Sequence, residues 1–134
     1  MTDVTPEEKK KRALEYLAQS LSYLNNMEEA MRDGRPEKAG EFLWGSVATA
    51  LKAIAMAKKG KTIKSHGEFW DLARELARET NNPSIYENFR EANSLHSNFY
   101  ESRLSSDDIK SSADKIVELV KKLRELTMHS IEEE

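Results

Sequence analysis

Apolar residues recur at intervals of three and four along nearly the whole chain, and this spacing constrains the fold more than any other feature. A helix has about 3.6 residues per turn, so positions with this spacing lie on one face of a helix. No segment shows the strict alternation of apolar and polar residues that a half-buried strand requires. The sequence therefore predicts an all-α protein in which each helix buries one face.

Residues that start and stop helices divide the chain into five helical segments. Thr5, Ser65 and Ser105 can cap the first, third and fifth segments, and Gly60 can stop the second. The predicted helices run from Thr5 to Asp33, from Pro36 to Lys59, from Ser65 to the Asn82-Pro83 boundary, over residues 85–104, and from Ser105 toward the acidic tail. The short connections favour an antiparallel bundle of about five helices, and the length of 134 residues favours a single domain over residues 1–134.

The first two segments differ in the kind of residue on their apolar faces. In the first, large side chains form one predicted seam: Leu14, Leu17, Leu21, Leu24, Met27 and Met31. The second adds a strip of small residues and is interpreted as the central helix. Gly40 and Gly45 each cost about 1 kcal/mol relative to alanine in an exposed helix, so we expect close approach of a neighbour there. Trp44 is interpreted as a core or interface residue rather than a platform for a ligand.

The composition excludes several classes of protein. The absence of cysteine excludes disulfides, thiolate metal sites and cysteine nucleophiles. A net charge of −3 and a pI of about 5.7 do not fit a broadly basic nucleic-acid-binding surface, so any such contact would be local. The lysines and arginines available for a local patch are Lys9 to Arg12, Lys58, Lys59, Lys61 and Lys64. No apolar run approaches the ~18 residues of a membrane span, and we expect a soluble, cytoplasmic protein without membrane contact.

Motifs for phosphate loops and metal sites are excluded by their spacing. Gly60-Lys61-Thr62 lacks the earlier glycine and the preceding strand that a phosphate-binding loop needs, and it follows a helix. The three histidines are far apart in sequence, and none has a partner at the spacing typical of helical metal sites. His66, at the start of the third helix, is interpreted as a turn residue more readily than as a ligand. We expect neither a metal nor another cofactor.

The predicted helix over residues 85–104 carries the most suggestive polar side chains. Its apolar residues lie within one arc, the polar residues occupy the adjoining arc, and His96 lies at the boundary. The residues on the polar arc are Tyr86, Arg90, Asn93, Ser97 and Tyr100. We interpret Arg90 and His96 as candidate catalytic residues and the other four as candidate contacts to a substrate.

Arginine and histidine together suit the cleavage of RNA through its own 2′-hydroxyl. Histidine can move protons near neutral pH, and arginine supplies a fixed cation for the phosphate oxygens. Six residues on an ideal helix place Arg90 and His96 about 120° apart around the axis. A functional pair would therefore need a bend in the helix or a second copy of it across a two-fold axis, and the alternative is an ordinary surface arginine beside a core-edge histidine.

Several segments resemble the HEPN superfamily, in particular its archaeal paREP-like branch. They are ELARET followed by NNPSIYENF, the run FLWGSVATALKAIA with GKTIKSHGEF, and above all ANSLHSNFYE with Arg90 six residues before His96. The resemblance covers nearly the whole chain and implies a helical bundle that pairs as a homodimer. It also implies a metal-independent endoribonuclease acting on single-stranded RNA at the dimer cleft. Arg90 would then stabilise the phosphate and His96 would act as acid or base.

The resemblance leaves a second function open. Active HEPN relatives often carry a small polar residue directly after the arginine, whereas this chain has Glu91. Several HEPN families are non-catalytic modules that bind a nucleotide or a protein such as a nucleotidyltransferase. The sequence therefore predicts either a ribonuclease or a helical binding module.

Overall fold

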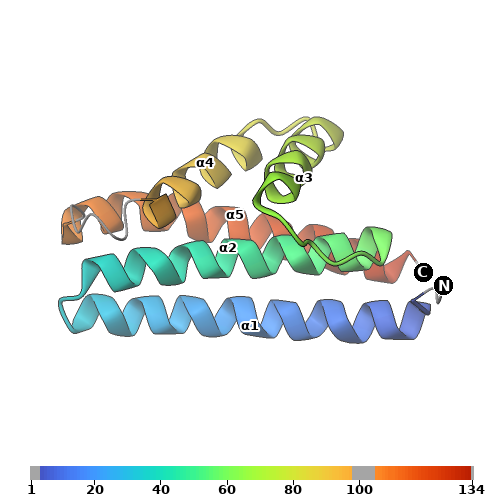
Figure 1. Ribbon diagram of the computed structural model, residues 1–134, viewed down its shortest axis with the longest axis horizontal. Coiled ribbons are helices and arrows are strands. Elements are labelled where there is room, and N and C mark those ends of the chain that lie inside the picture. The colour runs from blue at the N-terminus through green and yellow to red at the C-terminus, as the bar shows by residue number, and fades with distance from the viewer. Residues whose placement is uncertain (1–3, 98–104, 134) are drawn as a thin grey trace.

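The computed structural model describes residues 4–97 and 105–133, which form a helical bundle (Figure 1). The helices are α1 (Pro6–Arg32), α2 (Pro36–Lys59), α3 (His66–Glu79), α4 (Ser84–Ser97) and α5 (Ser106–Glu132). Helices α1, α2 and α5 lie along the long axis, while α3 and α4 cover one side of the bundle at an angle to it. The predicted all-α bundle of five helices is confirmed. Residues 98–104, the last part of the predicted fourth helix, lie outside the described residues.

The predicted helix starts are confirmed by the hydrogen bonds at their caps. The hydroxyls of Thr5 and Ser65 each accept a hydrogen bond from the backbone N–H three residues later. Ser105 and Asp108 form a reciprocal capping box, and these hydrogen bonds from Ser105 lower the pKa of Asp108. Gly60 ends α2 with a φ of 62°, in the left-handed region that glycine adopts without strain.

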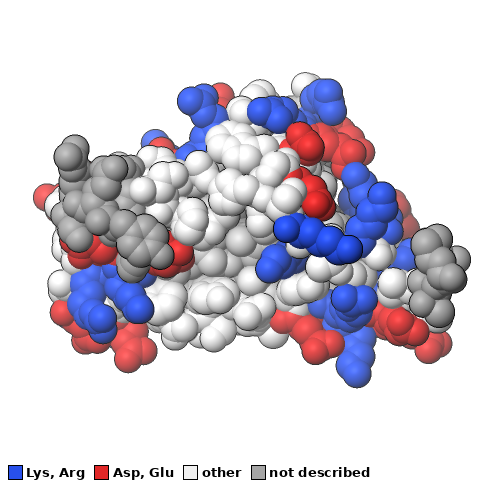
Figure 2. Space-filling view, in the orientation of Figure 1, with Lys and Arg blue, Asp and Glu red and all other residues white. Residues whose placement is uncertain are grey.

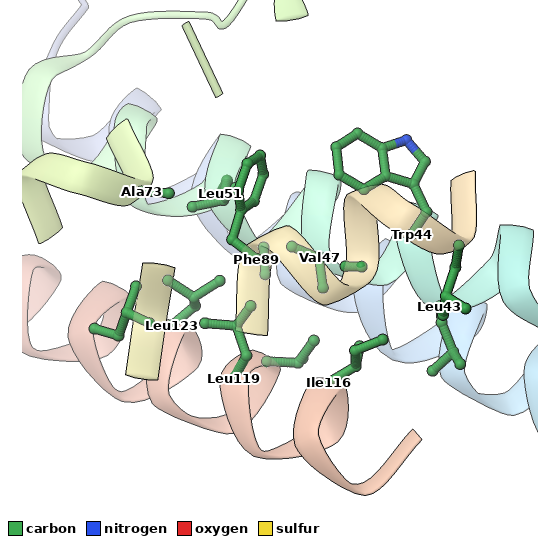
Figure 3. Packing of buried hydrophobic residues seen from close by; sticks show 14 of the residues in the cluster. Leu43, Trp44, Val47, Leu51, Ala73, Phe89, Ile116, Leu119 and Leu123 are labelled. Atoms are coloured by element: carbon green, nitrogen blue, oxygen red, sulfur yellow. The ribbon is translucent and has the colours of Figure 1, made fainter. Parts of the chain in front are cut away.

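Helix α2 is the centre of the bundle, as its small residues predicted. It packs against each of the other four helices. Its buried residues are Ala39, Gly40, Leu43, Trp44, Ser46, Val47, Thr49, Ala50, Leu51, Ala53, Ile54, Ala55, Met56 and Ala57. In Figure 3, Val47 and Leu51 of α2 lie near Phe89 of α4, with Leu119 and Leu123 of α5 on the other side. The core is thus built mainly from α2, α4 and α5.

The predicted apolar seam of α1 is wrong at two of its leucines. Leu14 is 38% exposed and Leu21 is 47% exposed. Leu17 and Met27 of that seam are buried as predicted, together with Ala13, Ser20 and Ala30. Small residues at this face let α1 approach α2 closely, and the Ser20 hydroxyl donates to the carbonyl oxygen of Ser46 at 2.7 Å. The buried face of α1 therefore combines small side chains with Leu17 and Met27, and Leu14 and Leu21 lie outside it.

The glycine at position 45 is explained by the same close approach. A Cβ added there would lie 3.1 Å from Cδ1 of Tyr23 on α1. The ring of Tyr23 therefore occupies the space that a side chain would need, and the predicted close approach at Gly45 is confirmed.

Within the two described ranges, no helix is both long enough and apolar enough to cross a membrane.

Two leucine-to-alanine substitutions should separate the real core from the wrongly predicted seam. Leu43 of α2 is completely buried, so Leu43→Ala should lower the free energy of unfolding by about 2–5 kcal/mol. Leu21→Ala, at an exposed position, should change it by less than about 1 kcal/mol. Urea unfolding followed by circular dichroism measures both values. Equal losses for the two variants would contradict the packing of α1 described above.

Candidate functional site

His96 lies at the edge of the core, where α4 packs on α2. The four buried residues of α4 are Ile85, Phe89, Ala92 and Leu95, as the sequence predicted. The side chain of His96 follows at the boundary and is 35% exposed. Its Nδ1–H donates to Glu41, with Oε1 at 2.9 Å and Oε2 at 3.2 Å. Its ring stacks on the indole of Trp44, with centroids 5.2 Å apart and planes 24° apart.

A second histidine shares the same tryptophan. The His66 ring lies 5.4 Å from the ring of Trp44 and 5.9 Å from the ring of His96, and the two imidazole planes are 29° apart. His66 Nε2–H donates to Oδ1 of Asn93 at 2.9 Å. We refer to Glu41, Trp44, His66, Asn93 and His96 as the histidine–tryptophan cluster.

Three helices supply this cluster, each for a local reason. Helix α2 contributes Glu41 and Trp44, which are one turn apart and so lie on the same side of the helix. Helix α4 contributes Asn93 and His96, which are also one turn apart. His66 is the first residue of α3, because Ser65 caps that helix. In Figure 2, the middle of this face, next to α3 and α4, is largely uncharged, and charged side chains lie along its upper edge and toward both ends of the molecule.

Aromatic side chains close the cluster on its inner side. The rings of Phe69 and Phe89 each lie 5.8 Å from the ring of Trp44. Trp44 is buried, as the sequence predicted, while His66 is exposed. The two imidazoles therefore lie on a largely buried group of aromatic rings, and both remain accessible to a molecule in solution.

Arg90 is not part of the cluster. It is exposed on α4, and the described residues provide no contact between its side chain and that of His96. This agrees with the separation of about 120° expected for six residues on a helix. A single copy of α4 therefore does not present Arg90 and His96 to the same atom.

The other predicted contact residues have different surroundings. Asn93 belongs to the cluster, and Ser97 is exposed at the end of α4. Tyr86 instead packs with Trp70 and Arg74, and the Arg74 guanidinium lies 5.4 Å from the ring centre of Tyr86. Tyr100 lies outside the described residues.

Glu91, the residue after Arg90, contacts α5, a helix that contributes no residue to the histidine–tryptophan cluster. Its Oε2 accepts a hydrogen bond from the hydroxyl of Ser112 on α5. Ser112 is buried, so this bond holds α4 to α5. This hydrogen bond between helices explains why a carboxylate occupies the position after Arg90.

The sequence did not reveal Glu41, and it did not pair His66 with His96. Glu41 is 55 residues from His96, and His66 is 27 residues from Asn93. Neither contact leaves a periodic pattern within one segment, because each depends on how two helices meet. A glutamate one turn before a tryptophan in the central helix is the only local signal, and it is a weak one.

The proposed local basic patch is partly neutralised by α3. Lys58 and Lys59, at the end of α2, pair with Glu79 and Glu75. Lys59 Nζ lies 3.0 Å from Oε1 of Glu75, and this hydrogen bond is the main cause that lowers the pKa of Glu75. Arg12 of α1 donates to the hydroxyl of Thr62 at 3.4 Å.

The described ranges contain no group of three or more histidine, aspartate or glutamate side chains placed to hold a metal ion.

A comparison with models of known protein families matches most of the chain. The model of the archaeal PaREP1/PaREP8 family matches residues 15–120, which include all of α2, α3 and α4. No curated protein and no solved structure matches the chain.

The ion pair between Lys59 and Glu75 should make stability depend on pH. Because the folded-state pKa of Glu75 lies below 4.5, the pair stabilises the fold above that pH, and the effect is lost as the pH falls through the folded-state value. Lys59→Met should therefore lower the free energy of unfolding by less than about 1 kcal/mol near pH 7, since the pair is partly exposed. Near pH 3 the difference from the wild type should shrink.

Urea unfolding at the two pH values measures this effect, with Lys115→Met in α5 as the matched control. Lys115 is an exposed lysine within a helix, so the control accounts for the loss of one positive charge and for the change in helix propensity. A loss for Lys59→Met that grows as the pH falls would contradict the assigned sign.

Proposed function

The chain belongs to the archaeal PaREP1/PaREP8 family, and on that premise we propose that it is a HEPN-like, metal-independent endoribonuclease that acts on single-stranded RNA. The observation that carries the proposal is the state of His96, which is half-buried, held by a carboxylate and backed by a tryptophan. A histidine used only for packing would not need a charged partner on another helix. A histidine that moves a proton needs a fixed orientation, which Glu41 supplies.

The chemistry of RNA cleavage assigns a role to His96. The 2′-oxygen attacks the neighbouring phosphorus, a cyclic phosphate forms, and the bond from phosphorus to the 5′-oxygen breaks. Both the removal of the 2′-proton and the protonation of the leaving oxygen are suited to histidine near neutral pH. Since Nδ1–H donates to Glu41, the proton that His96 exchanges with RNA is at Nε2. When His96 takes up that proton, the carboxylate compensates the new positive charge.

Arg90 supplies the cation for the phosphate from a second copy of the chain. Two copies of α4 related by a two-fold axis would bring Arg90 of each protomer toward His96 of the other. Arg90 is exposed and so is available for such a contact. Asn93 and Ser97, on the same side of α4, would contact the RNA, and Tyr86 and Tyr100 are proposed as further RNA contacts. The chain is a single catalytic domain in this arrangement.

Cleavage of labelled RNA in the presence of EDTA tests the activity. We expect wild-type protein to cut single-stranded RNA and to leave a cyclic phosphate end. His96→Ala and Arg90→Ala should each lower the rate by about 10²-fold or more, because each removes one of the two chemical functions.

His129→Ala and Arg124→Ala are the matched controls, since both residues are exposed on α5. They should retain wild-type rates. Equal cutting by all five proteins would indicate a contaminating nuclease. Intact RNA with every protein would reject the ribonuclease for that set of substrates and favour the non-catalytic module that binds a nucleotide or a nucleotidyltransferase.

Mixing the two inactive variants tests the shared site. In a dimer of Arg90→Ala with His96→Ala, one of the two sites carries both changes and the other carries neither. About half of randomly mixed dimers are of this kind, so the mixture should recover about a quarter of the wild-type rate. Light scattering should give the mass of a dimer at micromolar concentration. A monomer, or a mixture that stays inactive, would mean that the two residues do not meet across a dimer.

A further inference from the structure

We propose that His66 is a second proton-transfer residue of this site and that it forms an acid–base pair with His96 within one protomer. This inference rests on the proposed ribonuclease function. It adds a residue from α3 to a site that so far uses α2 and α4. His66 is the first residue of α3, directly after the loop that follows α2. The pair would supply both proton transfers of the reaction, while the second copy of the chain supplies only the cation.

The two imidazoles are oriented through opposite ring nitrogens. His96 donates from Nδ1 to the Glu41 carboxylate, so its free nitrogen is Nε2. His66 donates from Nε2 to the amide oxygen of Asn93, so Nδ1 is the nitrogen that is left to face a substrate. Each ring therefore keeps one nitrogen for a substrate and uses the other to fix its orientation. This is the arrangement expected of two groups that exchange protons.

The two rings are close enough to act on one phosphodiester. Their centroids are 5.9 Å apart, and both rings rest on Trp44. The attacking and leaving oxygens lie on opposite sides of the phosphorus in an in-line displacement, so two separate groups can serve both oxygens in one step. A single histidine would have to serve both oxygens in turn.

The charges around the pair favour a division of roles. The carboxylate of Glu41, on α2, faces His96. The uncharged amide of Asn93, on α4, faces His66. The aromatic rings of Phe69 and Phe89 face Trp44. The carboxylate stabilises positive charge on His96 as that ring accepts a proton. Two imidazolium ions at this separation repel each other, which disfavours protonation of both rings at once. A histidine oriented by a carboxylate acts as the base in a catalytic triad, so we assign His96 as the base. His66, which then holds the extra proton of the pair before the reaction, is the acid.

The proton balance of the reaction is then complete. Nε2 of His96 takes the proton of the 2′-hydroxyl, and the 2′-oxygen forms its bond to phosphorus. The bond between phosphorus and the 5′-oxygen breaks. His66, which starts with a proton on both nitrogens, gives its Nδ1 proton to that oxygen and keeps the proton on Nε2. One proton is removed and one is delivered, so no cofactor is consumed. Exchange with water afterwards returns each histidine to its starting state.

Two substrates with different leaving groups test the assignment. In RNA the leaving 5′-oxygen needs a proton, whereas the 4-nitrophenolate of a uridine 3′-(4-nitrophenyl phosphate) leaves without one. His66→Ala should lower kcat/KM on RNA by about 10²-fold or more and on the nitrophenyl ester by less than about tenfold. His96→Ala should lower kcat/KM on both substrates, because both need a base.

His66→Phe tests whether a loss of activity in His66→Ala comes only from losing the ring that packs on Trp44. Phenylalanine keeps a ring against Trp44 but has no proton to give, so this variant should lose activity on RNA as His66→Ala does. Thermal unfolding confirms that the variants are folded. The pH profile adds a separate readout: the wild-type rate on RNA should fall at high pH, where the acid loses its proton, and this fall should disappear in the His66 variants.

The outcomes separate this inference from the ribonuclease proposal. A wild-type protein that cleaves neither substrate overturns both. An active wild type whose rate on RNA survives His66→Ala and His66→Phe overturns the histidine pair alone. Equal losses on the two substrates also overturn the acid role, because an acid is not needed for the nitrophenyl ester.

Discussion

The close packing of α2 against every other helix is the constraint on which the rest of the structure depends. Alanine, glycine and serine occupy many of its buried positions, so neighbouring backbones can approach it from several sides. The hydroxyls buried there are satisfied locally: Ser46 donates to the carbonyl oxygen of Leu43, and Thr49 donates to that of Gly45. The helix can therefore be buried without unpaired polar groups, which would cost more than its packing returns.

Because α2 is fixed in this way, its side chains are fixed reference points for the site. Glu41 and Trp44 project from the first half of α2 toward the place where α3 begins and α4 ends. One residue orients His96 by a hydrogen bond, and the other supports both imidazoles by stacking. The site is thus carried by the most buried helix of the bundle, and its polar groups come from helix positions at the edge of the core.

The sequence predicted the helices and caps, which depend on neighbouring residues. It did not predict the contacts between residues that are far apart in the chain. The five helices and the caps at Thr5, Ser65 and Ser105 follow from local hydrogen-bonding patterns, and the structure confirms them. Leu14 and Leu21 were misplaced because helical spacing identifies a face without specifying which face meets the neighbour. The helical arc of residues 85–104 and the chemistry of histidine made His96 a candidate, and the family resemblance supported it.

The surroundings of His96 could not be predicted in the same way. The bonds from His96 to Glu41 and from His66 to Asn93 each join two helices, and their geometry depends on the crossing of those helices. No spacing within one segment encodes that crossing. Arg90 remains a prediction, since its partner would belong to another copy of the chain.

Helix α3 contacts only α2 and α4 among the described elements, and it buries only Leu72, Ala73 and Leu76. A helix held by so few buried side chains can open locally at a lower free energy than global unfolding requires. Such an opening would carry His66 away from His96 and leave the core of α2, α4 and α5 intact. The distance between the two imidazoles would then be set by a local equilibrium, and any molecule bound between them would slow hydrogen exchange at the amides of α3.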